Sequence, residues 1–217
     1  MYEEEGAAEA CVKAVCNELR NLTNRSVLIV VNDGSKDGTQ EILQRLTLSE
    51  KPLIVVNHLS NRGYGAALRT GLEEAAKNGY DYALFMDSDL TNDPHDIPRF
   101  ITQMEQGVDV IKATRYSKGG KVSGVPFYRV AISVCGNLLA RLLFGLPIHD
   151  CTNGFRAGKV GLMMQMNLTE NRFPIIMEEL YWCRFLAQTY AEVPVTLTNR
   201  KPGQRATSFV YKPAVFY

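Results

Sequence analysis

The sequence lacks the features of a membrane-spanning or disulfide-stapled protein. No apolar stretch reaches the roughly 18 uninterrupted residues that a helix needs to cross a bilayer. The longest apolar stretch, residues 130–148, is broken by Asn137 and Arg141. The five cysteines form no CxxC pair, and this odd count favours reduced thiols on the cytosolic side of a membrane. The first ten residues carry four glutamates, which argues against a secretory signal.

Several kinds of chemistry are also missing from the sequence. We find no Ser/His/Asp triad, no zinc-ligand set and no basic patch interleaved with aromatics, and therefore expect no nucleic-acid partner. His58, His95 and His149 lie in no recognisable motif, so we expect them to be incidental. The 217 residues are 46% apolar and 22% charged, which predicts one globular domain, residues 1–217, with a substantial core.

The net charge of +1 hides an uneven distribution. Residues 1–111 carry 18 acids and 10 bases, a balance of −8, whereas residues 112–172 carry 2 acids and 9 bases, a balance of +7. This asymmetry favours a metal or polar-substrate end beside an anion-binding end. Random scatter of surface charge is the alternative.

Apolar runs and helical segments alternate along the first half of the chain. The runs are residues 27–31, 53–56, 82–86 and 108–111. Helical spacing of apolar residues marks 7–19, 38–46, 65–78 and 94–106. Short β-branched runs separated by helices are typical of βαβ units. We therefore predict an α/β fold in which residues 27–113 form an open, doubly wound, mainly parallel sheet.

A polar loop follows each predicted strand. These loops are residues 32–39, 61–66, 87–89 and 114–116. Ligands of doubly wound sheets bind outside the carboxyl ends of the strands. We therefore expect the four loops to converge on one pocket.

Asp87, Ser88 and Asp89 form the sharpest motif. Alternate residues of extended backbone point to the same side, so the two carboxylates would repel each other unless a cation lay between them and a phosphate. Hard oxygen ligands favour Mg²⁺ or Mn²⁺, which would bridge to a diphosphate and stabilise its departure. The alternative is a polar loop that caps the following helix.

The first two loops offer groups for a nucleotide. Asp33 could accept the imide N–H of a uracil or the N–H groups of a guanine, and pure turn chemistry is the alternative. Gly63 and Gly65 precede a helix and offer unobstructed backbone amides to an anion.

The segment 128–144 is apolar almost all round. Its polar residues, Arg129, Ser133, Asn137 and Arg141, recur every four residues and form one stripe on a helix. The pattern fits a helix at a membrane boundary, with Arg129 and Ser133 turned toward a lipid phosphate. A buried core helix with snorkelling arginines fits equally well. Lys118 and Lys121 lie close by in sequence and would meet anionic head groups.

Further charged candidates lie near the C-terminus. Asp150, or Glu179 beside Glu178, could supply a base or orient an arginine, and a helix-start role for the glutamates is the alternative. Arg200 and Arg205 could form a basic lid over a diphosphate, and a solvated chain end is the alternative.

Taken together, the motifs resemble family 2 glycosyltransferases with a GT-A fold. They are most similar to the dolichol-phosphate mannosyltransferase-like branch, which transfers a sugar onto polyprenyl or dolichyl phosphate. The similar stretches are VNDGSKDGT, NRGYGAALRTG, DYALFMDSDLTNDP, DVIKATRY, residues 128–146, DCTNGFRAG and AEVPVTLTNR. They span nearly the whole chain.

The resemblance implies a metal-dependent, inverting hexosyltransferase. Its donor would be a UDP- or GDP-sugar, its acceptor a polyprenyl phosphate, and its location peripheral on the cytosolic face of a membrane. Residues 27–113 would bind the donor and 114–217 the acceptor. A family 2 enzyme acting on a saccharide and a non-catalytic nucleotide-sugar-binding remnant are the alternatives.

The resemblance also implies residue roles. The nucleotide sugar would be bound by Tyr2, Glu4, Asp33, Gly63, Gly65, Asp87, Ser88, Arg200 and Arg205. The metal would be held by Asp87 and Asp89, and the acceptor phosphate by Arg115, Arg129 and Ser133. Catalytic roles would fall to Asp89, Asp150 and Glu179. The family normally begins with an apolar strand before the turn that Tyr2 and Glu4 match, and we expect that strand to be absent here.

Overall fold

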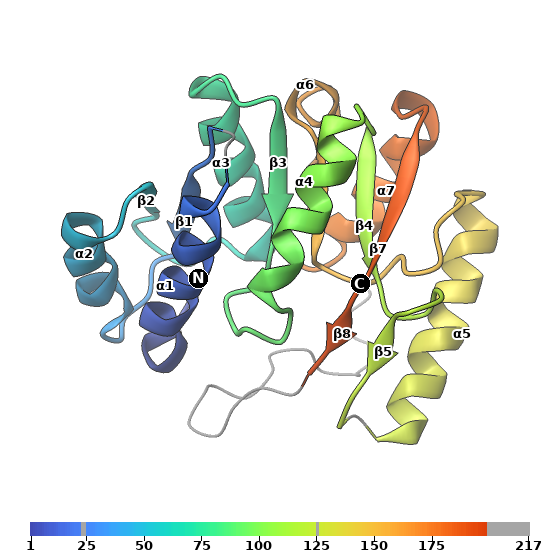
Figure 1. Cartoon of the computed structure of the whole chain (residues 1–217), viewed down its shortest axis with the longest axis horizontal. Coiled ribbons are helices and arrows are strands. Elements are labelled where there is room, and N and C mark those ends of the chain that lie inside the picture. Colours follow the sequence, from blue (N-terminus) through green and yellow to red (C-terminus); the bar gives the residue numbers. More distant parts are fainter. Residues whose placement is uncertain (23–24, 125, 199–217) are drawn as a thin grey trace.

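A computed structural model describes residues 1–22, 25–124 and 126–198 (Figure 1). Its helices are α1 (Glu5–Arg20), α2 (Thr39–Ser49), α3 (Tyr64–Lys77), the 3₁₀ turn η1 (Pro94–Asp96), α4 (Ile97–Glu105), α5 (Phe127–Phe144), α6 (Val160–Met163) and α7 (Ile175–Leu186). Its strands are β1 (Leu28–Asn32), β2 (Leu53–Asn57), β3 (Tyr82–Phe85), β4 (Val110–Thr114), β5 (Lys121–Val122), β6 (Arg156–Lys159), β7 (Tyr190–Pro194) and β8 (Thr196–Leu197). The predicted α/β alternation is confirmed.

The predicted single sheet over residues 27–113 is wrong. Within the described ranges, β1 and β2 pair in parallel as one sheet, a second sheet has the order β3-β6-β4-β7, and β5 pairs with β8. Strand β6 runs antiparallel to both β3 and β4 and separates them, whereas β7 runs parallel to β4. The sequence of β6, Arg-Ala-Gly-Lys, contains no β-branched or aromatic residue, so no strand signal marks it.

Residue Met1 lies beside the free edge of β1. Its ammonium donates a hydrogen bond to the Val31 carbonyl at 2.5 Å, and its own carbonyl accepts from the Asp33 amide at 2.8 Å. The start of the described chain is thereby fixed next to the loop that follows β1. The expected absence of a first strand stays a prediction.

Helix α1 fixes the position of β1. Ala8, Val12 and Cys16 recur every four residues, so they share one face of the helix, and all three are buried. Val12 and Cys16 pack in one apolar cluster with Val30 of β1 and Leu43 of α2. This packing sets the carboxyl end of β1, where the candidate site begins.

Helix α5 stands at the outer edge of the molecule, beside the β5–β8 pair (Figure 1). Its large apolar side chains face outward: Leu142 is 72% exposed and Leu143 is 65% exposed. The hypothesis of a buried core helix is therefore wrong for this chain. Among the described residues, no helix is long and apolar enough to cross a membrane.

Candidate active site

Asp33 lies directly after β1 and is almost fully buried. Its carboxylate accepts hydrogen bonds from the backbone amides of Arg62 at 2.9 Å and Gly63 at 2.8 Å. His58 Nδ1 lies 2.6 Å from the same carboxylate, and its Nε2 lies 2.9 Å from the hydroxyl of Thr70. The loop after β1 and the turn before α3 are therefore held together by one buried carboxylate.

The Gly63–Gly65 turn is covered by the segment that joins α6 to α7. Gly63 has a left-handed backbone (φ +99°), and a Cβ added there would lie 2.3 Å from the Asn171 carbonyl oxygen. A Cβ at Gly65 would lie 2.2 Å from the Glu170 carbonyl oxygen. Glycine is required because backbone approaches backbone. The Gly63 amide binds Asp33 and the Gly65 amide binds the Asn171 carbonyl at 2.8 Å, so both amides hold the turn itself, and the prediction that they are open to an anion is wrong.

Substituting Gly65 with alanine tests this close approach. We expect G65A to lower the free energy of unfolding by about 1–3 kcal/mol, because an added methyl group must displace backbone. The matched control is G71A in the same helix, where the added Cβ would meet only Val31 at 3.7 Å. Helix propensity predicts that G71A is stabilising by roughly 0.5–1 kcal/mol. Urea titration of both variants measures the difference, and equal effects would contradict the close approach.

Asp87 and Asp89 follow β3. Asp87 lies against Gly154, since a Cβ added to that glycine would meet the Asp87 carboxylate at 3.0 Å and the Tyr64 hydroxyl at 3.2 Å. The Asp89 side chain is buried and accepts from the Thr91 amide at 3.0 Å and hydroxyl at 2.7 Å. These bonds fix Asp89 in a tight turn beside Asp87.

A dense polar turn, residues 150–156, joins this carboxylate pair to the loop after β4. Asp150 is fully buried and accepts from Arg115 through Nε at 2.7 Å and Nη2 at 2.8 Å. Burial alone would raise the pKa of Asp150, but the hydrogen bonds and charge of Arg115 outweigh it and hold that pKa below its ordinary value. Asp150 is therefore ionised and paired at neutral pH.

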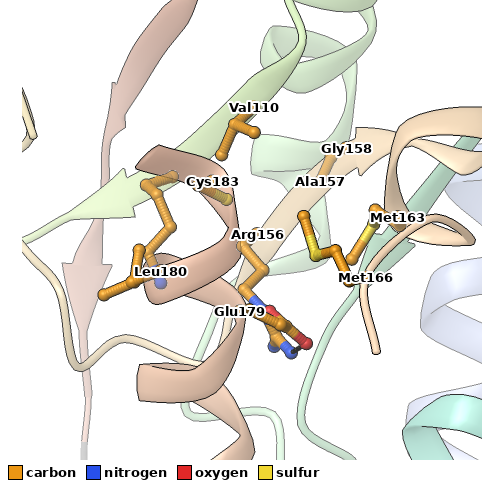
Figure 2. A pocket seen from close by; sticks show the side chains of 10 residues that line it. Val110, Arg156, Ala157, Gly158, Met163, Met166, Glu179, Leu180 and Cys183 are labelled. Atoms are coloured by element: carbon orange, nitrogen blue, oxygen red, sulfur yellow. Dashed lines mark hydrogen bonds and ion pairs between the residues drawn. The ribbon is translucent and has the colours of Figure 1, made fainter. Parts of the chain in front are cut away.

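Arg156 and Glu179 form a second buried ion pair, across β6 and α7 (Figure 2). Arg156 also donates to the Gly154 carbonyl at 2.8 Å. Burial opposes the charge on Arg156, yet Glu179 and Tyr64 raise its pKa above the ordinary value. Both carboxylates predicted as assisting groups, Asp150 and Glu179, are thus held by arginines. Their catalytic roles stay predictions.

The polar stripe of α5 attaches to the same turn. The Tyr116 hydroxyl donates to Ser133 Oγ at 2.8 Å. Asn137 Nδ2 donates to the Thr152 hydroxyl at 3.2 Å, and Asn137 Oδ1 accepts from the Cys151 amide at 2.6 Å. The polar face of α5 therefore lies next to the Arg115–Asp150 pair, while its apolar face is exposed.

The remaining candidates lie at the edges of this arrangement. Tyr2 and Ser88 are half-buried. Glu4 is buried, its amide donates to the Thr39 hydroxyl at 3.0 Å, and its carbonyl accepts from the amides of Ala7 and Ala8 in the first two turns of α1. Arg200, Arg205 and the side chain of Arg129 lie outside the described residues.

One continuous series of contacts now joins the four predicted loops. Asp33 holds Gly63, Tyr64 follows Gly63 in the chain, and Tyr64 and Asp87 meet at Gly154. Burial raises the pKa of the Tyr64 hydroxyl, and the charge of Asp87 raises it further. From Gly154 the turn runs back to Asp150 and hence to Arg115. The structure therefore brings the loops together at one edge of the two larger sheets.

A family model described as glycosyl transferase family 2 matches residues 1–166. The chain belongs to this family. It is 31% identical to polyprenol monophosphomannose synthase of Mycolicibacterium smegmatis, over 81% of this chain and 68% of that protein. It is 32% identical to dolichol-phosphate mannosyltransferase of Pyrococcus furiosus, over 94% of this chain and 56% of that protein. The chain thus spans little more than half the length of the second relative.

Solved structures show the fold of this glycosyltransferase. Glucosyl-3-phosphoglycerate synthase from Mycobacterium tuberculosis, crystallised with Mn²⁺, UDP and phosphoglyceric acid, superposes with a TM-score of 0.68 at 20% identity, over 93% of this chain and 68% of that one. The same enzyme with Mg²⁺ and UDP gives a TM-score of 0.63 at 21% identity, over 89% of this chain and 68% of that one. The chain therefore has an α/β fold of the GT-A type.

The two carboxylates of this family 2 site fit a hard divalent cation. The described part of the chain contains no group of three His, Cys, Asp or Glu side chains arranged to hold a metal. Mg²⁺, however, usually takes one or two carboxylates and completes its shell with water and substrate phosphates. Asp87 and Asp89 therefore suit a cation that arrives with a diphosphate.

Sequence reasoning missed His58 and Lys112. A single histidine outside any motif gave no signal, yet His58 bridges Asp33 and Thr70. Lys112 directly follows the apolar run 108–111 that predicts a strand, and nothing in that pattern indicates its bond to the Asn153 carbonyl. Both roles arise from contacts between segments distant in sequence.

Proposed function

We propose that this glycosyltransferase moves a sugar from a UDP- or GDP-sugar onto a polyprenyl or dolichyl phosphate, with inversion at the anomeric carbon. One observation carries the proposal: the Arg115–Asp150 turn is bonded to the polar stripe of a helix that also carries a row of exposed, large apolar side chains. A lipid phosphate needs both an anion site and an adjacent apolar surface. The names of the relatives support the same acceptor class.

In this proposal the donor binds over residues 27–113. Asp33 would contact the nucleotide base, and Tyr2, Glu4 and Ser88 would line the same site. Asp87 and Asp89 would hold Mg²⁺ or Mn²⁺, which when bound would stabilise charge on the departing diphosphate. Because Gly63 and Gly65 have no side chains, no side chain occupies the nucleotide end of the site at these two positions. Arg200 and Arg205 are assigned to the diphosphate by the resemblance alone.

The acceptor half is residues 114–217. A phosphate monoester is already anionic near neutral pH, so it needs orientation more than a strong base. Arg115, Arg129 and Ser133 would orient its oxygens for attack on the face opposite the nucleotide. Asp150 stabilises Arg115 in place, and either Asp150 or Glu179 would serve as an assisting carboxylate.

The exposed face of α5 would lie along a membrane surface, on its cytosolic side. This apolar face consists of Phe127, Tyr128, Ile132, Val134, Leu138, Leu139, Leu142 and Leu143, all exposed. Lys118 and Lys121 are exposed in the segment of the chain that precedes the helix. An apolar helix face flanked by cations binds anionic bilayers.

Placing two aspartates on this face tests membrane binding. We expect the double variant L142D/L143D to lose at least 10-fold in binding to anionic phosphatidylglycerol vesicles, because two charges would have to leave water. Vesicle flotation measures the bound fraction. The matched control is L48D on α2, where the leucine is 86% exposed and far from α5. Equal binding by the variant and the wild type would contradict the proposed face.

Direct transfer tests the reaction. The chain is incubated with radiolabelled UDP- or GDP-sugars, Mg²⁺ or Mn²⁺, and polyprenyl phosphate in vesicles. We expect label in the lipid phase that requires both the metal and the lipid phosphate. No lipid-linked product with any donor would overturn the proposal. Transfer to a soluble saccharide under the same conditions would favour the alternative acceptor.

A further inference from the structure

Lys112 is a buried cation with an unusual setting. It lies in the middle of β4 and is 1% exposed. Its neighbours along the strand, Ile111 and Ala113, are fully buried apolar residues. Across the sheet it faces Arg156, a second buried cation. No described carboxylate lies within ion-pair distance of its ammonium group, which donates instead to the Asn153 carbonyl at 2.8 Å.

This setting costs stability. Burial and the charge of Arg156 together lower the pKa of Lys112 to about 8, although Asp150 and Glu179 act in the opposite direction. Like charges directly opposite on a sheet repel each other, and an apolar side chain would fill the position without that penalty. Arg156 and Glu179 line a small cavity (Figure 2). Lys112 lines it too, and its volume of about 20 Å³ leaves room for one water molecule. Because a residue that destabilises the fold is usually kept for its function, this setting indicates that Lys112 has a role in the site.

The carbonyl that Lys112 binds lies at the centre of the 150–156 turn. The Asn153 amide donates to Asp150 at 3.2 Å, and the Asn153 side chain accepts from the Phe155 amide at 3.0 Å. On one side of Asn153, Asp150 binds Arg115; on the other, Gly154 lies against Asp87. The shape of this turn therefore sets the distance between Arg115, at the proposed acceptor site, and Asp87, at the proposed metal site.

We propose that Lys112 is a positioning residue, whose bond to the Asn153 carbonyl holds the 150–156 turn so that Arg115 and Asp87 keep their relative placement. The structural part of this inference stands on its own, and its catalytic part rests on the proposed function. A charged ammonium makes a stronger hydrogen bond than a neutral amine. The hydrogen bond from Lys112 to the Asn153 carbonyl therefore weakens once Lys112 loses its proton.

The charges around Lys112 come from every element packed on it. They are Arg156 on β6, Asp150 and Cys151 in the turn, Glu179 and Cys183 on α7, and Glu192 on β7. Arg156 and Asp150 keep their charges through the alkaline range, and burial raises the pKa of Cys183 to about 12. Lys112 is thus the group of this set whose charge changes near pH 8.

The variant K112M separates a positioning role from a packing role. Methionine fills the position without charge and removes the repulsion from Arg156. At pH 7 we expect a melting temperature no lower than that of the wild type. We nevertheless expect at least 3-fold faster hydrogen exchange at the amides of residues 150–156, measured by mass spectrometry. The control K159M removes a half-exposed lysine paired with Asp109 and should leave exchange in the turn unchanged.

Steady-state kinetics of K112M are the second test of this role. We expect K112M to lower kcat about 10-fold, with KM for the nucleotide sugar unchanged because the Asp33 end is untouched. The wild-type kcat should fall as pH rises through about 8, and K112M should lack that alkaline limb. Unchanged exchange in the turn, or a joint fall of activity and melting temperature, would overturn the inference. An inactive wild type would overturn the proposed function, while exchange and melting would still decide the role of Lys112.

Discussion

Replacing Asp87 with asparagine is expected to lower kcat for sugar transfer by about 10³-fold, or ~4 kcal/mol of transition-state stabilisation. The amide keeps the size of the carboxylate, so the contact with Gly154 remains. It removes one of two negative charges that would hold the cation against the departing diphosphate. Initial rates measured against Mn²⁺ concentration report the effect, and the apparent affinity for the metal should fall together with kcat.

The matched control for D87N is D93N in the same loop. Asp93 is exposed, and its side chain accepts from the His95 amide at the start of η1. Asparagine caps helices about as well as aspartate, so D93N should keep both stability and rate. If D87N retained the wild-type rate and metal dependence, the carboxylate pair would not be the metal site.

Removing Glu179 is expected to have the largest effect on stability. The variant E179A leaves Arg156 buried without its partner and beside Lys112, so two cations face each other across the sheet. Breaking a buried ion pair from one side costs about 3–5 kcal/mol. Urea denaturation measures the loss. Activity must be assayed well below the lowered melting temperature, because unfolding would otherwise mimic a catalytic role.

Its control is E73A, which removes an exposed glutamate of α3. A surface carboxylate outside any network contributes within about 0.5 kcal/mol, so E73A should unfold at nearly the wild-type urea concentration. A loss below about 1 kcal/mol for E179A would contradict the importance of the ion pair. Transfer activity in folded E179A would in turn argue against Glu179 as the assisting carboxylate.

Much of the fold could be predicted from local pattern. Short β-branched runs placed β1 and β2 within a residue of their observed ends, because a buried parallel strand needs an apolar side chain on both faces. Strand β6 could not be predicted, because its Arg, Ala, Gly and Lys residues pair between β3 and β4 only through tertiary context. Pairing partners are set by the whole sheet, and periodicity carries no information about them.

The sequence predicted where the candidate site lies in the fold, but it did not predict which residues contact one another there. Loops after strands point to one edge by geometry alone: Asp33 binds Gly63, Asp87 lies against Gly154, and Arg115 binds Asp150 of the same 150–156 turn. The ion pairs Arg115–Asp150 and Arg156–Glu179 join residues 35 and 23 positions apart. No spacing rule links such residues, so their partners emerge only from the fold.

The antiparallel insertion of β6 has a practical consequence for attempts to dissect this enzyme. Residues 27–113 and 114–217 are the proposed donor-binding and acceptor-binding halves, but we expect that a chain cut at residue 113 would not fold as two independent fragments. Without β6, strands β3 and β4 would each present an open hydrogen-bonding edge, which invites aggregation. Chimaeras of this protein should therefore keep residues 27–113 and 114–217 from the same parent, and split reporters should not be cut between them.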